Sequence, residues 1–271
     1  MTTVQPAPES ACSPVTGDAI RLIILEQSYR ARVGHIGSAL SVADLIAACF
    51  DGGLNLTSPA DPNRDLLVMS KGHAALALYA AFRMREWIDD ETLSTYCCDG
   101  SLLGVHPDHR LPGVDFSTGS LGQGLSIGVG TALAARLTES SRRVAVLMSD
   151  AECNEGSVWE AAAFAAQHRL SQLRVIIDSN GQQALGYTSE VLEPTPLAAR
   201  FDAFGWDVRL VDGHDRDAIV DALRLPAAKP AAIVAKTTFG SGVSFMEQSI
   251  PWHYLPMTAE QFLLAVLEVT K

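Results

Sequence analysis

The sequence is poor in lysine and lacks any long apolar run. It has four lysines, and its 31 acidic residues exceed the 20 basic ones, which gives a formal net charge of −11. Such an acidic chain argues against nucleic acid or an anionic membrane as a partner. No apolar run is long enough to span a membrane, and the first residues lack the basic and apolar regions of a signal peptide. We therefore predict a cytoplasmic protein without membrane or nucleic-acid partners.

Cysteine is scarce and irregularly spaced, so neither a disulfide framework nor a zinc site is expected. The five thiols, predicted to be free, are Cys12, Cys49, Cys97, Cys98 and Cys153. By contrast, 48% of the 271 residues are hydrophobic, which is ample for a large core. Residues 1–15 are polar and contain proline, and we predict a disordered tail there. No linker divides residues 16–271, which are expected to form one domain.

Short apolar, β-branched runs alternate with helical patterns along the chain. We expect strands at 65–69, 144–149, 175–177, 206–211 and 231–235, with helices at 18–30, 41–50, 72–86, 119–137, 195–204, 215–223 and 258–269. Ser41-Val-Ala-Asp44 looks like a capping box that opens the second of these helices. The alternation predicts an α/β fold, in which a parallel sheet carries helices on both faces.

Two oxygen-bearing side chains follow neighbouring strands of the predicted sheet. Asp150 follows the run 144–149, and Asn180 follows the run 173–179, with a helical stretch between them. In open α/β sheets, ligands bind at the carboxyl ends of the strands. A carboxylate and an amide oxygen suit a hard cation such as Mg²⁺, which commonly also binds phosphate oxygens. The pair therefore predicts a site for a metal–diphosphate.

Further motifs give this pair a family context. In order along the chain they are Gly34-His-Ile-Gly-Ser38, Ser70-Lys-Gly-His73, His106-Pro107, Ser117-Thr-Gly-Ser-Leu-Gly-Gln-Gly124, Ala203-Phe-Gly-Trp206, Asp212-Gly-His-Asp215 and Trp252-His253. Together with Asp150 and Asn180 they resemble the N-terminal, diphosphate-binding part of transketolase, in the same order. The resemblance implies a thiamin diphosphate-binding fold and a transferase that moves a two-carbon ketol unit from a ketose to an aldehyde.

The resemblance also implies which residues hold the cofactor. Mg²⁺, or Ca²⁺ or Mn²⁺ in its place, would be bound by Asp150, Asn180 and the backbone carbonyl of Gln182. Gly119 would offer its carbonyl to the aminopyrimidine, and Leu121 would pack on that ring. The other implied cofactor contacts are His73, Ala151, Glu152 and His253. Ser149 and Ala151 depart from the family pattern, which has glycine at both positions.

The implied catalytic residues are four histidines: His35, His73, His106 and His253. Imidazole can both donate and accept protons near neutral pH, which suits work on hydroxylated sugars. His109, His168 and His214 lie outside these roles, and we expect them to be packing, solvent-facing or structural. Glu155 and Glu160 are implied to join a proton network across a subunit interface.

The family's pyrimidine-binding domain, with its activating Glu, has no counterpart before Lys271. We therefore expect this chain to be the first subunit of a split transketolase, completed by a C-terminal subunit in an α₂β₂ assembly that acts on small sugars or aldehydes. Phe239 and Ser241 stand where the family often has lysine, which favours a specialised biosynthetic pathway. Two alternatives stay open: a subunit of another thiamin diphosphate-dependent synthase or decarboxylase, and a non-catalytic cofactor-binding scaffold.

Overall fold

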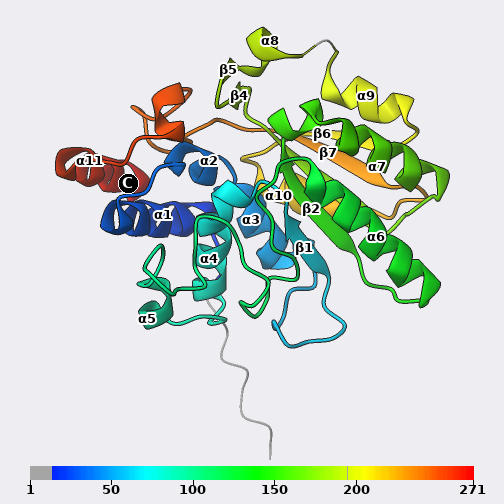
Figure 1. The fold of residues 1–271 in the computed structure, drawn as a ribbon, viewed down its shortest axis with the longest axis horizontal. Coiled ribbons are helices and arrows are strands. Elements are labelled where there is room, and N and C mark those ends of the chain that lie inside the picture. Colours follow the sequence, from blue (N-terminus) through cyan, green and yellow to red (C-terminus); the bar gives the residue numbers. More distant parts are fainter. Residues whose placement is uncertain (1–13, 194) are drawn as a thin grey trace, which may run out of the picture.

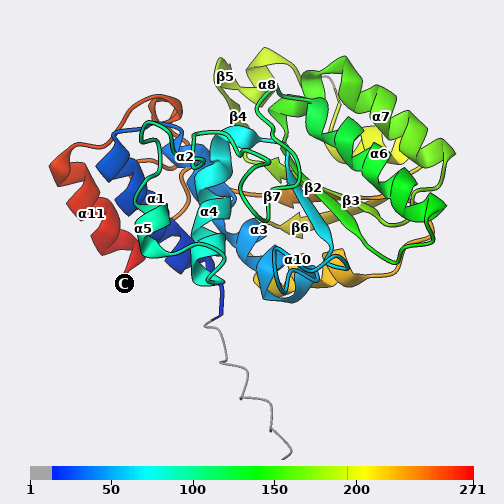
Figure 2. The same ribbon diagram turned by 60° about the horizontal axis from the view of Figure 1, so that its bottom comes forward.

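A five-stranded parallel sheet forms the centre of the protein (Figures 1 and 2). The computed structural model describes residues 14–193 and 195–271. Its strands, in the order β1-β2-β3-β7-β6, are β1 (Leu66–Met69), β2 (Val144–Ser149), β3 (Leu173–Ser179), β7 (Ala231–Lys236) and β6 (Asp207–Asp212). All neighbouring pairs are parallel, so the carboxyl ends of the strands share one edge. The predicted α/β fold is confirmed.

Helices cover both faces of this sheet. One face carries α6 (Gln123–Leu137), α7 (Gly156–Gln167) and α9 (Leu197–Ala203). The other carries α1 (Gly17–Ala31), α2 (Ile36–Ser41), α3 (Ala43–Ala48), α4 (Ala75–Met84) and α10 (Arg216–Arg224). Figure 2 shows α6 and α7 side by side on one side and α10 on the other. The last helix, α11 (Ala259–Val269), packs against α1 through stacking of Tyr29 on Phe262.

The strands β1 and β2 are almost entirely apolar because the sheet is buried on both faces there. Along β2, Ala145 and Leu147 join the core under α1 to α4, whereas Val144, Val146 and Met148 join the core under α6 and α7. Side chains that alternate between two covered faces must all be apolar, which explains the continuous hydrophobic runs in the sequence. The polar residues that follow these runs are therefore confined to the edge where the strands end.

Short elements complete the fold around that edge. They are the helices α5 (Asp90–Leu93) and α8 (Thr188–Val191), the hairpin of β4 (Gln182–Gln183) and β5 (Gly186–Tyr187), a π-helical turn at Cys49–Gly53, and 3-10 turns at Gly72–Ala74, Ala151–Asn154 and Ile250–His253. The β4–β5 hairpin directly follows Asn180. It therefore belongs to the functional edge of the sheet.

The predicted helix over 41–50 is wrong at its start. Ser41 ends α2, and its hydroxyl donates to Asp178 Oδ1 at 2.6 Å instead of capping a helix. The helix predicted from residue 119 begins only at Gln123, because Gly119 and Gly122 have positive φ angles of 147° and 81°. Such angles suit glycine and interrupt a helix.

The amino-terminal boundary also differs slightly from the prediction. Val15 is fully buried, so packing begins before α1, while residues 1–13 of the predicted tail lie outside the described residues. The four cysteines in the described part of the chain are free, as predicted. Over residues 14–193 and 195–271, every helix is too short or too polar to cross a membrane.

Candidate functional site

A cavity of about 380 Å³ lies at the carboxyl ends of β1, β2 and β3. Predicted site residues from distant parts of the sequence line it: His35, His73, His106, Gly119, Leu121, Ala151, Glu155, Asn180, Gln182 and His253. Asp150 and Glu152 are buried beside it, and Glu160 is exposed on α7. The fold thus gathers most of the predicted residues around one volume.

Asp150 links the ends of β2 and β3. Its Oδ2 accepts a hydrogen bond from the Gly181 N–H at 2.9 Å, and its Oδ1 accepts one from the Ala151 N–H at 2.8 Å. Next to it, Asn180 Oδ1 accepts from the Gln182 N–H at 2.9 Å. Burial, followed by the charge of Asp178, raises the pKa of Asp150 to about 7. A cation at this point would offset that unfavourable charge, so the residues fit a divalent metal.

The predicted metal ligands include only one carboxylate. Among the described residues, no three His, Cys, Asp or Glu side chains gather as a metal site. The Asp150 carboxylate, the Asn180 amide and the Gln182 carbonyl would leave coordination positions for phosphate oxygens and water, as Mg²⁺ commonly requires. The donor set therefore suits a metal bound together with a diphosphate.

Sequence reasoning missed the buried ion pair that orients Asn180. Asp178 is fully buried and pairs with Lys71, whose side chain is 1% exposed. Ser41 and Thr237 donate to Asp178 Oδ1, and Asn180 Nδ2 donates to Oδ2 at 2.9 Å. This last bond fixes the Asn180 amide, which leaves its oxygen on the side of Gln182. The role of Asp178 was not predicted because this residue lies within the mostly apolar strand β3.

The Glu152 side chain lies behind the cavity. It is fully buried and does not line the cavity. The carboxylate accepts from the Ser70 hydroxyl, from the Gly122 N–H at 3.0 Å and from the Ser149 N–H at 2.9 Å. Glu152 therefore holds the loop before α6 against the ends of β1 and β2.

The four predicted catalytic histidines converge on the cavity. The ring centroids of His35 and His73 are 5.4 Å apart. The backbone N–H of His35 donates to the backbone carbonyl of His253 at 3.2 Å. The His106 ring lies against Gly119, where an added Cβ would come within 2.9 Å of its Cδ2. His253 stacks on the buried ring of Phe239 at 4.3 Å. Phe239 does not line the cavity itself, so it acts by supporting the His253 ring.

Three of these imidazoles, those of His35, His73 and His253, have a lowered pKa, which favours their neutral form. Burial is the main cause that lowers the pKa of His35, places that of His73 well below its usual value, and brings that of His253 to about 4. Neighbouring positive charges, including Lys71, add to the effect at His73 and His253. A neutral imidazole both donates and accepts hydrogen bonds, so these rings can bind hydroxyls and accept protons at neutral pH.

The depressed pKa of His253 predicts a loss of stability in acid. Between pH 6.5 and about 4, the unfolded chain takes up a proton at this residue while the folded protein does not, so the free energy of unfolding falls as the pH falls. We expect urea unfolding to show a shallower decline from pH 7 to pH 5 for His253→Gln than for the wild type. Parallel declines would contradict this prediction.

The backbone at the predicted cofactor contacts Gly119 and Ala151 is not strained by the departures from glycine. Gly119 lines the cavity with φ 147°, a conformation that favours glycine. Ala151 has no positive φ and begins a 3-10 turn, so its methyl group adds no backbone strain. Leu121 is 38% exposed at the cavity, which leaves an apolar surface for a ring. Ala151 therefore does not by itself argue against a bound diphosphate.

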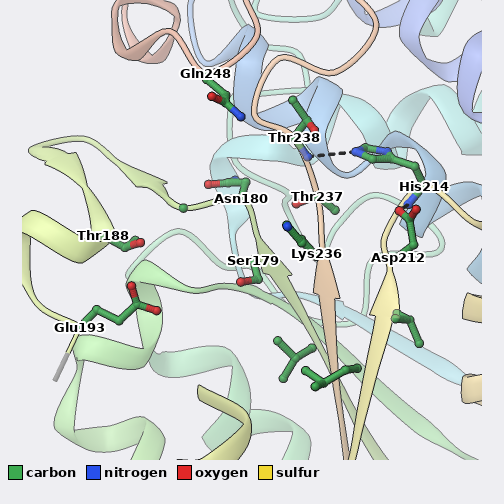
Figure 3. A pocket seen from close by; sticks show the side chains of 14 residues that line it. Ser179, Asn180, Thr188, Glu193, Asp212, His214, Lys236, Thr237, Thr238 and Gln248 are labelled. Atoms are coloured by element: carbon green, nitrogen blue, oxygen red, sulfur yellow. Dashed lines mark hydrogen bonds between the residues drawn. The ribbon is translucent and has the colours of Figure 1, made fainter. Parts of the chain in front are cut away.

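A second cavity, of about 850 Å³, lies over the ends of β3, β7 and β6 (Figure 3). Asn180 lines both cavities. His214 is fixed here, because its Nδ1 bonds Asp44 at 2.7 Å and its Nε2 accepts from the Thr238 N–H at 2.9 Å. His214 is therefore structural, as predicted. The other two histidines outside the site also fit their predicted roles, since His109 is 66% exposed and His168 packs on Phe164.

Comparisons with known proteins identify the family of this chain. Residues 15–265 match the family model described as "Transketolase, thiamine diphosphate binding domain". The chain is 38% identical to the 6-deoxy-6-sulfo-D-fructose transketolase subunit SqwG of Clostridium sp. (strain MSTE9), over 94% of each chain. It is 39% identical to an apulose-4-phosphate transketolase subunit of Phocaeicola vulgatus, over 92% of this chain and 90% of that one.

A solved transketolase structure has the same fold as this chain. The transketolase of Campylobacter jejuni superposes with a TM-score of 0.87 at 30% identity, over 95% of this chain. The match spans only 42% of that longer protein. The chain belongs to the transketolase family and corresponds to its thiamin diphosphate-binding domain. The predicted family, fold and transketolase-type transferase class are thereby confirmed.

Proposed function

We propose that this chain is the cofactor-anchoring subunit of a heteromeric transketolase. It moves a two-carbon ketol unit from a ketose donor to an aldehyde acceptor. The observation that carries the proposal is the cavity that Asn180 and four histidines line, with Asp150 buried beside it and bonded to the Gly181 N–H. The relatives named as transketolase subunits match this chain over at least nine-tenths of their own length, which supports a subunit role.

The residues of this chain divide into two groups in the proposed reaction. Asp150, Asn180 and the carbonyl of Gln182 would hold Mg²⁺ together with the diphosphate of thiamin diphosphate. When bound, that cofactor supplies the electron sink that stabilises the carbanion formed on cleavage of the donor. His35, His73, His106 and His253 bind substrate hydroxyls and move protons, since an imidazole can both donate and accept.

A partner subunit completes the site in this proposal. Leu121 and Leu185 line the cavity and are 38% and 82% exposed, which leaves apolar surface at its mouth. Exposed apolar groups beside a polar cavity are typical of interaction sites. The partner carries the pyrimidine-binding domain and its activating Glu, and two copies of each subunit form an α₂β₂ assembly. Glu155 and Glu160, both exposed, belong to the contact between subunits.

The proposal is tested by reconstitution with the partner subunit. We expect ketol transfer only when both subunits, Mg²⁺ and thiamin diphosphate are present, with activity saturating at an equimolar ratio. If this chain alone transfers ketol groups at ordinary enzyme rates, the split site is refuted.

The same reconstitution separates the two alternatives. Release of CO₂ from a 2-oxo acid without formation of a new ketose would identify a synthase or decarboxylase subunit. Absence of thiamin diphosphate binding by the complex in calorimetry would identify a scaffold. Ser149 and Ala151 motivate the scaffold reading, but the negative φ of Ala151 favours the catalytic one.

A further inference from the structure

The side chain of Gln182 is buried without a partner. The residue is 3% exposed, and neither Oε1 nor Nε2 has a hydrogen-bond partner among the described residues. Buried amides are nearly always hydrogen-bonded, because an unpaired donor or acceptor loses its bonds to water. Gln182 lines the cavity that holds the four histidines. Its amide therefore indicates a polar ligand group in this cavity.

Other unpaired buried atoms in the described chain are of a different kind. Arg85, Arg142, Arg174 and Asp115 each leave one atom unpaired while another atom of the same side chain is bonded. The remaining two, His35 Nδ1 and Gln183 Nε2, belong to residues of the same cavity as Gln182. The residues with an unpaired atom outside that first group thus all line the same cavity.

Gln182 is held firmly next to the metal anchor. Its N–H donates to Asn180 Oδ1 at 2.9 Å, and its backbone pairs with Tyr187 in the β4–β5 hairpin. The amide therefore belongs to the site and is not carried on a free loop.

The two polar atoms of the Gln182 amide need different partner groups. Nε2 needs an acceptor and Oε1 needs a donor. Ionised diphosphate oxygens only accept, so the cofactor's diphosphate would leave Oε1 unpaired. A hydroxyl both donates and accepts, and two adjacent hydroxyls satisfy both atoms of the amide. Resting on the function proposed above, we propose that the Gln182 side chain hydrogen-bonds the hydroxylated chain of the ketose donor and thereby selects polyhydroxylated donors.

The test is the variant Gln182→Met in the complex with the partner subunit. Methionine keeps the length of the side chain and removes both polar atoms. For the ketose that the wild-type complex cleaves fastest, we expect kcat/KM to fall roughly 10- to 100-fold, because a site built to bond a hydroxyl depends strongly on that bond. For hydroxypyruvate, which offers the same two-carbon unit with a carboxylate in place of the hydroxylated chain, we expect a change below about twofold.

A binding readout and a control complete the experiment. Calorimetry with Mg²⁺ and thiamin diphosphate is expected to give equal Kd values for Gln182→Met and wild type. Gln248→Met, at a glutamine of the second cavity, controls for the substitution itself. An equal loss with both donors, a weakened cofactor Kd, or unchanged kinetics would each overturn the proposal. A wild-type complex inactive with every donor would instead refute the proposed function.

Discussion

Replacing Asp150 with Asn is expected to abolish tight Mg²⁺-dependent binding of thiamin diphosphate. Asp150 is the only carboxylate in the proposed metal set, so the variant removes the charge that attracts the cation while keeping the shape of the side chain. Changes to groups that merely orient metal ligands cost about 10- to 100-fold in affinity. Loss of the ligand charge itself should cost on the order of 100-fold or more, measured by calorimetry in the complex with the partner.

The matched control is Asp212→Asn, at the end of β6 on the same edge of the sheet. Asp212 Oδ1 accepts from the His214 N–H at 2.9 Å, so it too caps a turn after a strand. We expect this control to bind the cofactor as the wild type does. Thermal unfolding of both variants without ligand checks that any loss of binding is not a loss of fold. Tight binding by Asp150→Asn would refute the assigned metal site.

The fold and the positions of Asp150 and Asn180 could be predicted because their signals are local. An apolar run followed by an oxygen-bearing residue marks the end of a buried parallel strand wherever it occurs. The run before Asp150 was placed correctly at 144–149, and Asn180 follows β3 as expected. Strand ends at one edge then bring Asp150 and the Asn180 segment into contact, which the bond to Gly181 confirms.

The groups that position the anchor could not be predicted, because their partners are distant in sequence. Ser41 looked like a helix cap, yet it donates to Asp178, which is 137 positions away. Glu152 accepts from Ser70 and Gly122, which are 82 and 30 positions away. Each of these side chains also fits an ordinary local role, such as a helix cap. Its actual hydrogen-bond partners are set by the packing of the strand ends. The same holds for the unpaired amide of Gln182.

Replacing Lys71 with Met is expected to destabilise the protein more than any single change at an exposed ion pair. Lys71 and Asp178 are 1% and 0% exposed, so the variant would leave a carboxylate buried without its cation. Breaking such a pair from one side typically costs about 3–5 kcal/mol in the free energy of unfolding. The control Arg110→Met breaks the exposed pair with Asp108 and should lower the free energy of unfolding far less, because water screens exposed charges. Urea unfolding of both variants measures the difference.

The double variant Lys71→Met with Asp178→Asn separates the charge from the positioning role. Removing both charges is expected to restore most of the stability, because the loss comes from the uncompensated carboxylate and not from the missing attraction. Cofactor binding should not recover with it. An amide at position 178 presents an NH₂ group as well as an oxygen, so it cannot accept from Ser41, Thr237 and Asn180 together. The Asn180 oxygen would lose its fixed direction, and affinity should stay about 10- to 100-fold below wild type. A double variant as unstable as the single one would contradict the charge argument, and one that binds the cofactor like wild type would contradict the positioning role of Asp178.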